Sequence, residues 1–110
     1  MNENDLLNRP SALDSDTALA QLRRLEPELR QFGVASLYLF GSLARGEAES
    51  ESDVDLFFEP QPGRRLSLLD VIGIRHFLED HLHSPVDLIL RESLHTMLRG
   101  DIEAEAVAVF

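Results

Sequence analysis

The chain has 110 residues, of which 44% are apolar, and a formal net charge of −10 at pH 7. That length fits one domain with one core. The absence of cysteine excludes disulfides, zinc–thiolate sites and cysteine nucleophiles, and all ten basic residues are arginine, which excludes a catalytic lysine. Residues 47–59 hold six acidic residues and no basic one. Because such a surface repels a phosphate backbone, we expect no direct nucleic-acid partner, whereas a cation or a basic protein suits it.

No segment is apolar over the roughly 20 residues needed to cross a bilayer, and the first residues lack the pattern of a signal peptide. We therefore expect a cytoplasmic protein that does not bind membranes. Residues 1–14 are predicted to form a flexible N-terminal lead-in, and residues 15–110 a single folded domain.

The first half of that domain predicts one helix and two strands. Apolar residues recur every three or four positions from 19 to 32, which predicts an amphipathic helix that ends at Gly33, with a kink or a break near Glu26 because Pro27 lies inside it. Residues 35–40 are apolar enough for a strand buried on both faces, and residues 53–59 predict a second strand.

The second half predicts a helix from Ser67 or Asp70 to Leu82, a strand over 86–90 and a helix over 93–105. Residues 107–110 predict a terminal strand or an apolar tail. The residues expected to face the core from the two helices are Leu68, Leu69, Ile72, Phe77 and Leu78, then Leu94, Met97, Leu98 and Ile102. This order predicts an α/β (α+β) fold with a small mixed sheet of three to four strands covered by helices.

Gly41 and Ser42 end the first predicted strand and open a short helical segment. Backbone N–H groups and a hydroxyl at such a point hold phosphates, because the start of a helix carries partial positive charge. Glycine at position 41 would let a polyphosphate approach the backbone closely. Gly-Ser is also a common turn, and the motif alone does not separate the two interpretations.

Asp53 and Asp55 flank Val54 at the start of the second strand. Residues two apart on a strand point the same way, with Cα atoms about 6.5–7 Å apart. Two adjacent carboxylates repel each other unless a cation lies between them, and an all-oxygen pair suits Mg²⁺. An acidic turn that leads into a strand would show the same residues.

Asp87 lies within the apolar run of the third predicted strand. Carboxylates are rarely buried without a partner, so its position is unusual, although an edge aspartate facing water would also fit. If the three strands pair, Asp87 reaches Asp53 and Asp55. Three carboxylates can hold two metal ions about 3.5–4 Å apart, which is the arrangement used for in-line phosphoryl or nucleotidyl transfer.

The spacing is more specific than its parts. Gly41-Ser42, ten residues and Asp53-x-Asp55 fix four positions, and a chance match in a chain this long is roughly one in a thousand. With Asp87 as the third acid, the sequence resembles the minimal nucleotidyltransferases of the DNA polymerase beta superfamily. The resemblance covers nearly the whole chain after residue 14 and implies the polymerase beta-like nucleotidyltransferase fold.

The resemblance also implies roles for these residues. Gly41 and Ser42 would hold the β- and γ-phosphates of ATP, the donor substrate. Asp53, Asp55 and Asp87 would be the catalytic acids and the ligands of two Mg²⁺ ions, with Asp87 also acting as a general base. Arg45, the only cation of this loop, could pair with phosphate, and an ion pair with Glu47 or Glu49 explains it equally well.

Stand-alone proteins of this size resemble antitoxins whose partner is a HEPN ribonuclease toxin. The implied function is Mg²⁺-dependent transfer of AMP from ATP to a toxin hydroxyl, that of tyrosine, in a homodimer or a hetero-oligomer with the toxin. Two alternatives stay open: an antitoxin that neutralises its toxin by binding alone, and a nucleotidyltransferase that modifies a small molecule such as an antibiotic.

Overall fold

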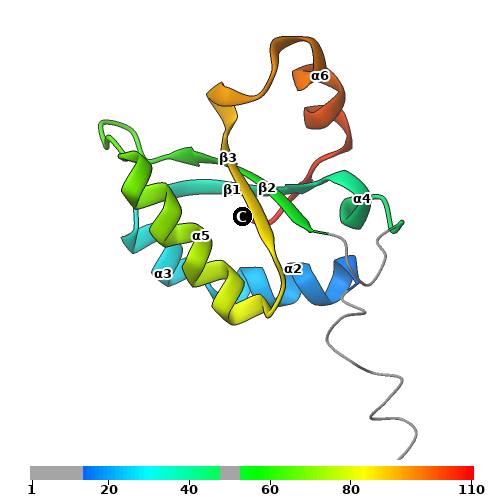
Figure 1. Cartoon of the computed structure of the whole chain (residues 1–110), viewed down its shortest axis with the longest axis horizontal. Helices are drawn as coiled ribbons and strands as arrows, with labels where there is room; N and C mark the ends of the chain where they lie inside the picture. The colour runs from blue at the N-terminus through cyan, green and yellow to red at the C-terminus, as the bar shows by residue number, and fades with distance from the viewer. Residues whose placement is uncertain (1–13, 48–52) are drawn as a thin grey trace, which may run out of the picture.

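The structure, a computed structural model, describes residues 14–47 and 53–110 as one sheet covered by helices. The predicted lead-in therefore lies outside the described residues except for Asp14. The elements are α2 (Ser15–Arg24), α3 (Glu26–Gln31), β1 (Val34–Phe40), α4 (Gly41–Ala44), β2 (Val54–Pro60), α5 (Leu68–Leu82), β3 (Val86–Leu90), the 3-10 turn η2 (Arg91–Ser93), α6 (Thr96–Glu105) and β4 (Val107–Ala108). The predicted fold class is confirmed: a mixed four-stranded sheet in the order β3-β2-β1-β4 (Figure 1).

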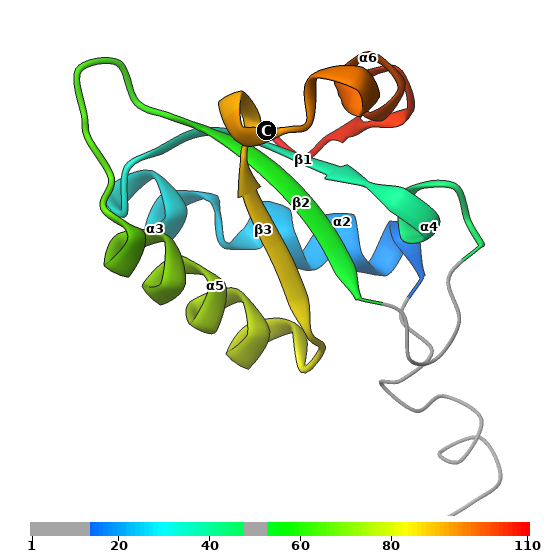
Figure 2. The ribbon, with the colours of Figure 1, turned by 45° about the horizontal axis from the view of Figure 1, so that its top comes forward.

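The helices form two unequal layers. Helices α2, α3 and α5 cover one face of the sheet, and α6 lies over the other (Figure 2). The main core lies under the three helices, where every second strand residue is buried: Leu37 and Leu39 on β1, Val54, Leu56 and Phe58 on β2, and Val86 on β3. A smaller core on the α6 face is built from Phe40, Phe57 and Leu94. The alternation of strand side chains thus assigns each residue to one layer.

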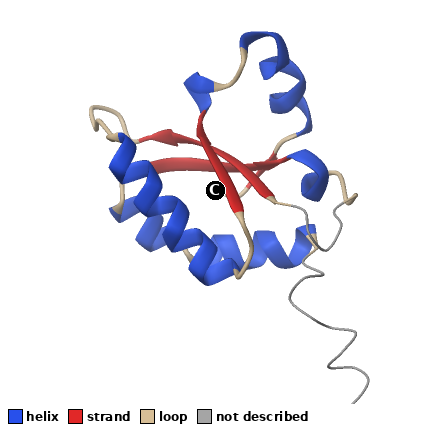
Figure 3. Ribbon diagram, viewed as in Figure 1, coloured by secondary structure: helices blue, strands red, loops and turns tan. Residues whose placement is uncertain are grey.

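Strand pairing follows the element lengths and connections. Strand β1 runs antiparallel to β2 and to β4, and β2 runs parallel to β3 through the α5 crossover (Figure 3). A parallel pair needs such a crossover, because a short turn cannot return the chain to the same edge. Within the described ranges, no helix is long and apolar enough to span a membrane.

The first predicted helix is two helices, broken at Leu25. The residue before proline is disfavoured in helical geometry, and Pro27 stands at the start of α3, where its missing N–H costs nothing. Asp14 caps α2 by accepting a hydrogen bond from the Thr17 backbone N–H at 2.7 Å. Of the predicted kink or break near Glu26, the structure shows the break, because Leu25 leaves helical geometry and α3 begins at Glu26.

Two predictions about buried faces are wrong. Leu68 and Leu69 are largely exposed, because they occupy the first turn of α5, and the buried stripe of that helix starts a turn later and includes Ile74 and Leu78. Met97 and Leu98 are exposed as well, with Met97 at 83%. The third helix begins at Thr96 rather than at residue 93, and these two residues fall on its outer face.

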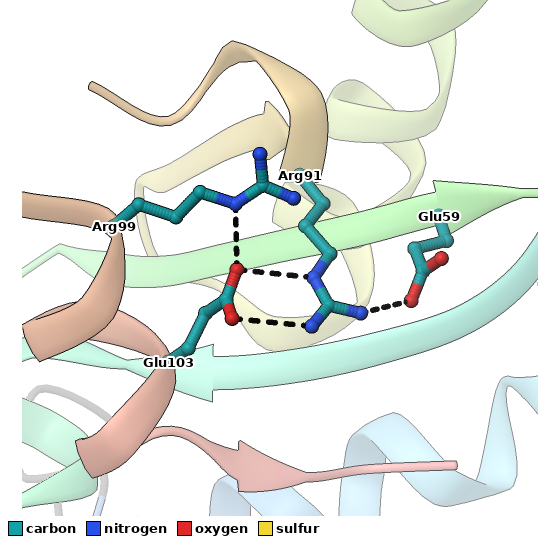
Figure 4. A network of polar contacts seen from close by, with 4 residues as sticks. All are labelled: Glu59, Arg91, Arg99 and Glu103. Carbon is teal, nitrogen blue, oxygen red and sulfur yellow. Dashed lines mark hydrogen bonds and ion pairs between the residues drawn. The ribbon is translucent and has the colours of Figure 1, made fainter. Parts of the chain in front are cut away.

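Helix α6 is fastened to the sheet by charges rather than by an apolar stripe (Figure 4). Arg91, just after β3, donates from Nε and Nη2 to the Glu103 carboxylate at 3.2 Å and from Nη1 to Glu59 at the end of β2. Arg99 donates to the same Glu103 oxygen at 2.7 Å. These two arginines hold the pKa of Glu103 at about 2 through hydrogen bonds. The four side chains set the position of α6 over the sheet.

Candidate active site

Asp55 and Asp87, the acids predicted on the second and third strands, lie side by side on adjacent strands of the sheet. The β2–β3 register pairs Asp55 with Asp87, and neighbouring pairs on both sides keep the same alignment. Their alternate neighbours Val54, Leu56 and Val86 are buried under the three helices. Asp55 and Asp87 therefore project from the opposite face, the one that carries α6.

Asp53 joins them at the start of β2. It is exposed, and its charge, like that of Asp87, acts on Asp55. Burial raises the pKa of Asp55 to about 6, and the negative charges of Asp87 and Asp53 add to the rise. We call these three residues the acid cluster. The structure thus places Asp87 beside Asp55 and puts Asp53 near enough for its charge to act on Asp55, with Asp87 exposed at the sheet edge rather than buried.

Gly41 lies directly against Asp55. It adopts φ +77°, a left-handed conformation that favours glycine. A Cβ built at Gly41 would clash with the Asp55 carboxylate, with Cγ only 3.1 Å and Cβ only 3.2 Å away. Position 41 therefore requires glycine for two independent reasons, and the β1 end and the acid cluster meet there.

Ser42 and Arg45 belong to the short turn that follows. Ser42 is half-buried within α4, and its carbonyl accepts a hydrogen bond from the Glu47 N–H at 2.9 Å, which closes the turn. Arg45 forms the predicted ion pair with Glu47 at 3.0 Å, whereas the alternative partner, Glu49, lies outside the described residues. Arg45 is near enough to Asp55 for its positive charge to lower the pKa of that carboxyl.

Sequence analysis missed one residue of this site, Glu105. Its carboxylate accepts two hydrogen bonds from Arg45 Nη1, at 3.1 and 3.0 Å, and a longer one from the Gly41 N–H at 3.4 Å. Glu105 is the last residue of α6, 64 positions from Gly41. The sequence around Glu105 gave no sign of a role at the site, because only the pairing of β4 with β1 brings this residue to the turn after β1.

The donor set of the acid cluster fits a hard divalent cation. All its ligand atoms are carboxylate oxygens, and a cation would offset the negative charges of Asp87 and Asp53, which add to the effect of burial on the pKa of Asp55. In the part of the chain that the structure describes, no three His, Cys, Asp or Glu side chains converge enough to enclose an ion. Mg²⁺ commonly takes only one or two protein carboxylates and completes its shell with water and substrate phosphate.

The comparisons with known proteins agree with this geometry. Residues 22–109 match the family model of the nucleotidyltransferase domain. Over 85 residues the chain is 41% identical to the protein adenylyltransferase MntA of Thermococcus cleftensis, which covers 74% of this chain and 82% of that protein.

Solved structures share the fold. A candidate minimal nucleotidyltransferase is 32% identical, with a TM-score of 0.74 over 87% of this chain and 96% of its own. A chain from the complex of the tri-AMPylated Shewanella oneidensis HEPN toxin with an MNT antitoxin has a TM-score of 0.63 at 20% identity, covering 84% of this chain and 71% of its own. The family predicted from the motif is therefore confirmed: the chain belongs to the nucleotidyltransferases, and within them to the minimal nucleotidyltransferases.

Proposed function

We propose that this nucleotidyltransferase is a protein adenylyltransferase that acts as an antitoxin in the cytoplasm. It transfers AMP from ATP to a hydroxyl, that of tyrosine, on a HEPN ribonuclease toxin. The observation that carries the proposal is the acid cluster of Asp53, Asp55 and Asp87, of which Asp55 lies directly against Gly41. The MntA relative and the MNT antitoxin complex, by their names, favour a protein acceptor over a small molecule.

In the reaction, the acceptor oxygen attacks the α-phosphorus of ATP, and a new P–O bond forms. The bond between the α-phosphorus and the bridging oxygen breaks, and pyrophosphate leaves with its electron pair. Asp87, exposed at the sheet edge, takes the proton of the attacking hydroxyl and passes it to water. Asp53 and Asp55 would hold two Mg²⁺ ions with Asp87, and when bound these ions stabilise the charge that develops on the phosphate.

The turn after β1 would receive the triphosphate. Gly41 brings the backbone of this turn against Asp55, while its N–H donates to Glu105 at 3.4 Å, and Ser42 adds a hydroxyl one residue later. Arg45 supplies the positive charge of this turn, held by Glu47 and Glu105. The phosphates would thus lie between the turn and the acid cluster, with the α-phosphorus towards Asp87.

The site is open on the side where an acceptor must enter. Asp53 and Asp87 are exposed, whereas Asp55 is only half-buried. A folded protein acceptor would itself exclude water from the site when it docks, which strengthens the electrostatic interactions there.

The test is an intact-mass measurement on the protein encoded beside this one, which the proposal takes to be the toxin. It is co-expressed with the wild type, with Asp53→Asn, or with the control Asp80→Asn, which removes one exposed carboxylate from α5. We expect the partner to gain one or more AMP masses with the wild type and with Asp80→Asn, and none with Asp53→Asn. Peptide mapping then identifies the acceptor.

The alternatives give different results. A partner that co-purifies unmodified with both wild type and Asp53→Asn, while cells stay protected, would contradict catalysis and support neutralisation by binding. An unmodified partner together with adenylylation of an aminoglycoside by the purified protein would support small-molecule modification.

A further inference from the structure

Glu105 reaches the active-site turn because of strand register. Strand β4 pairs antiparallel with β1, matching Tyr38 with Ala108 and Leu39 with Val107. Carried two residues further, the same register places Glu105 opposite Gly41. The Gly41 N–H, which follows the last residue of β1, donates to the Glu105 carboxylate.

The Glu105 carboxylate is the partner that fixes Arg45. Both of its oxygens accept from Arg45 Nη1, while Arg45 Nε donates to Glu47 on the other side. These hydrogen bonds raise the pKa of the arginine, which therefore keeps its charge. A guanidinium held by two carboxylates is restricted in orientation, whereas a free arginine side chain samples many rotamers.

Glu105 is itself held in place from two sides. Glu103, two residues before Glu105 in the last turn of α6, binds Arg99 of the same helix and Arg91 just after β3. After Glu105, β4 is paired with β1, and Arg23 donates to the Val109 carbonyl at 3.0 Å. The Glu105 carboxylate therefore lies between two segments that are each fastened to the sheet.

We propose that Glu105 is a positioning residue for nucleotide binding, which acts through Arg45. It holds the guanidinium and the Gly41 N–H in the arrangement that receives the triphosphate. This inference rests on the proposed function, because it takes ATP to be the ligand of that turn. It assigns a role outside the motif: helix α6 and strand β4, at the end of the domain, set the geometry of the turn after β1.

The test is calorimetric binding of magnesium–ATP to the purified chain, without a toxin. The variants are Glu105→Ala, Arg45→Ala, their double variant and the control Asp101→Asn, which removes an exposed carboxylate from the same helix. We expect Glu105→Ala to raise the Kd about tenfold, the size of a lost hydrogen bond to a charged group. Because Glu105 acts mainly through Arg45, the extra loss of affinity from Glu105→Ala in the Arg45→Ala background should be smaller than its loss in the wild type, and what remains measures the contact with the Gly41 N–H.

The thermal midpoint separates positioning from a structural role. The Arg45–Glu105 pair is partly exposed, with side chains 44% and 31% accessible, and such pairs contribute little to stability. Glu105→Ala should therefore melt within a few degrees of the wild type. Glu105→Gln keeps an acceptor for the Gly41 N–H and should recover part of the lost affinity.

Two results would overturn the inference. One is a Kd of Glu105→Ala that equals or falls below the wild-type Kd. The other is a loss of affinity in the double variant that equals the sum of the losses in the two single variants. If the wild type transfers AMP to its partner while Glu105→Ala keeps the wild-type Kd, this inference fails and the proposed function stands. If the wild type neither binds magnesium–ATP nor transfers AMP, both fail.

Discussion

Asp55 and Asp87 lie directly opposite each other on neighbouring parallel strands, and alternation with their buried neighbours places both on the sheet face away from the main core. Two like charges in this arrangement raise the free energy of the folded protein unless a proton or a cation offsets them. Burial raises the pKa of Asp55 to about 6, and this repulsion adds to the rise. The carboxylates are thus poor candidates for stabilising the fold and good ones for binding a cation.

The contact between Gly41 and Asp55 predicts that Gly41→Ala loses activity beyond its effect on stability. Alanine at φ +77° costs about 1–2 kcal/mol, and its Cβ would also push the Asp55 carboxylate out of place. Misplacing a catalytic group by about 1 Å lowers rates roughly a hundredfold. AMP transfer to the partner should fall by at least about that factor.

Gly63→Ala is the matched control for that variant. Gly63 has nearly the same φ, +78°, but nothing lies within 4 Å of its Cβ position. Gly63→Ala should lower the free energy of unfolding by about as much as the backbone strain does in Gly41→Ala, while AMP transfer stays intact. Equal activity losses in the two variants would show that strain, and not the Asp55 contact, explains the glycine.

The raised pKa of Asp55 predicts how stability depends on pH. The folded-state pKa, about 6, is above the ordinary value of 3.8, so between these pH values the folded state binds more protons than the unfolded state. Its contribution to stability is therefore lost as the pH rises through this window and does not return above it. The melting temperature of Asp55→Asn relative to wild type should rise from pH 4 to pH 6 and then level off.

Magnesium provides the control for this pH effect. Added above pH 6, it should raise the melting temperature of the wild type more than that of Asp55→Asn, because a bound cation offsets the same repulsion. A pH profile of the difference that is flat from pH 4 to pH 6 would contradict the assignment of the shift to Asp55.

The charged fastening of α6 predicts a salt-dependent loss of stability in Arg91→Met. Methionine keeps much of the apolar stem but cannot bind the carboxylates of Glu59 and Glu103. It also lacks the guanidinium, which lies 5.9 Å from the centroid of the Tyr38 ring. The melting temperature should fall by a few degrees at low salt, and less at high salt, where screening weakens the wild-type network. Arg65→Met, at an exposed loop arginine, should change little.

Two truncations near α6, one at a buried residue and one at an exposed residue, should differ greatly in their effect on the free energy of unfolding. Leu94 is 6% exposed and packs with Phe40 and Phe57, so Leu94→Ala should lower the free energy of unfolding by about 2–5 kcal/mol. Met97 is 83% exposed, and Met97→Ala should change it by less than about 0.5 kcal/mol. Chemical denaturation of both variants measures the difference. A large loss in Met97→Ala would mean that this face is covered.

Local sequence patterns were sufficient for most elements of the fold. The alternation around Val54 and Leu56 predicted the second strand and its buried face, and the Gly41-Ser42 and Asp53-x-Asp55 spacing predicted the family. These patterns are local because side-chain periodicity and backbone preference depend on near neighbours. They failed at Leu69 and Met97, since an apolar residue at helical spacing is buried only where another element covers it.

The local sequence thus determined the strands, the order of the elements and the acids that the chain carries, because each depends on a few adjacent residues. Tertiary structure alone decided which acids share a face and which distant residue completes the site. The β2–β3 register placed Asp87 beside Asp55, and the β1–β4 register brought Glu105 to Gly41. Register depends on how whole strands pack against a common core, so no single segment encodes it.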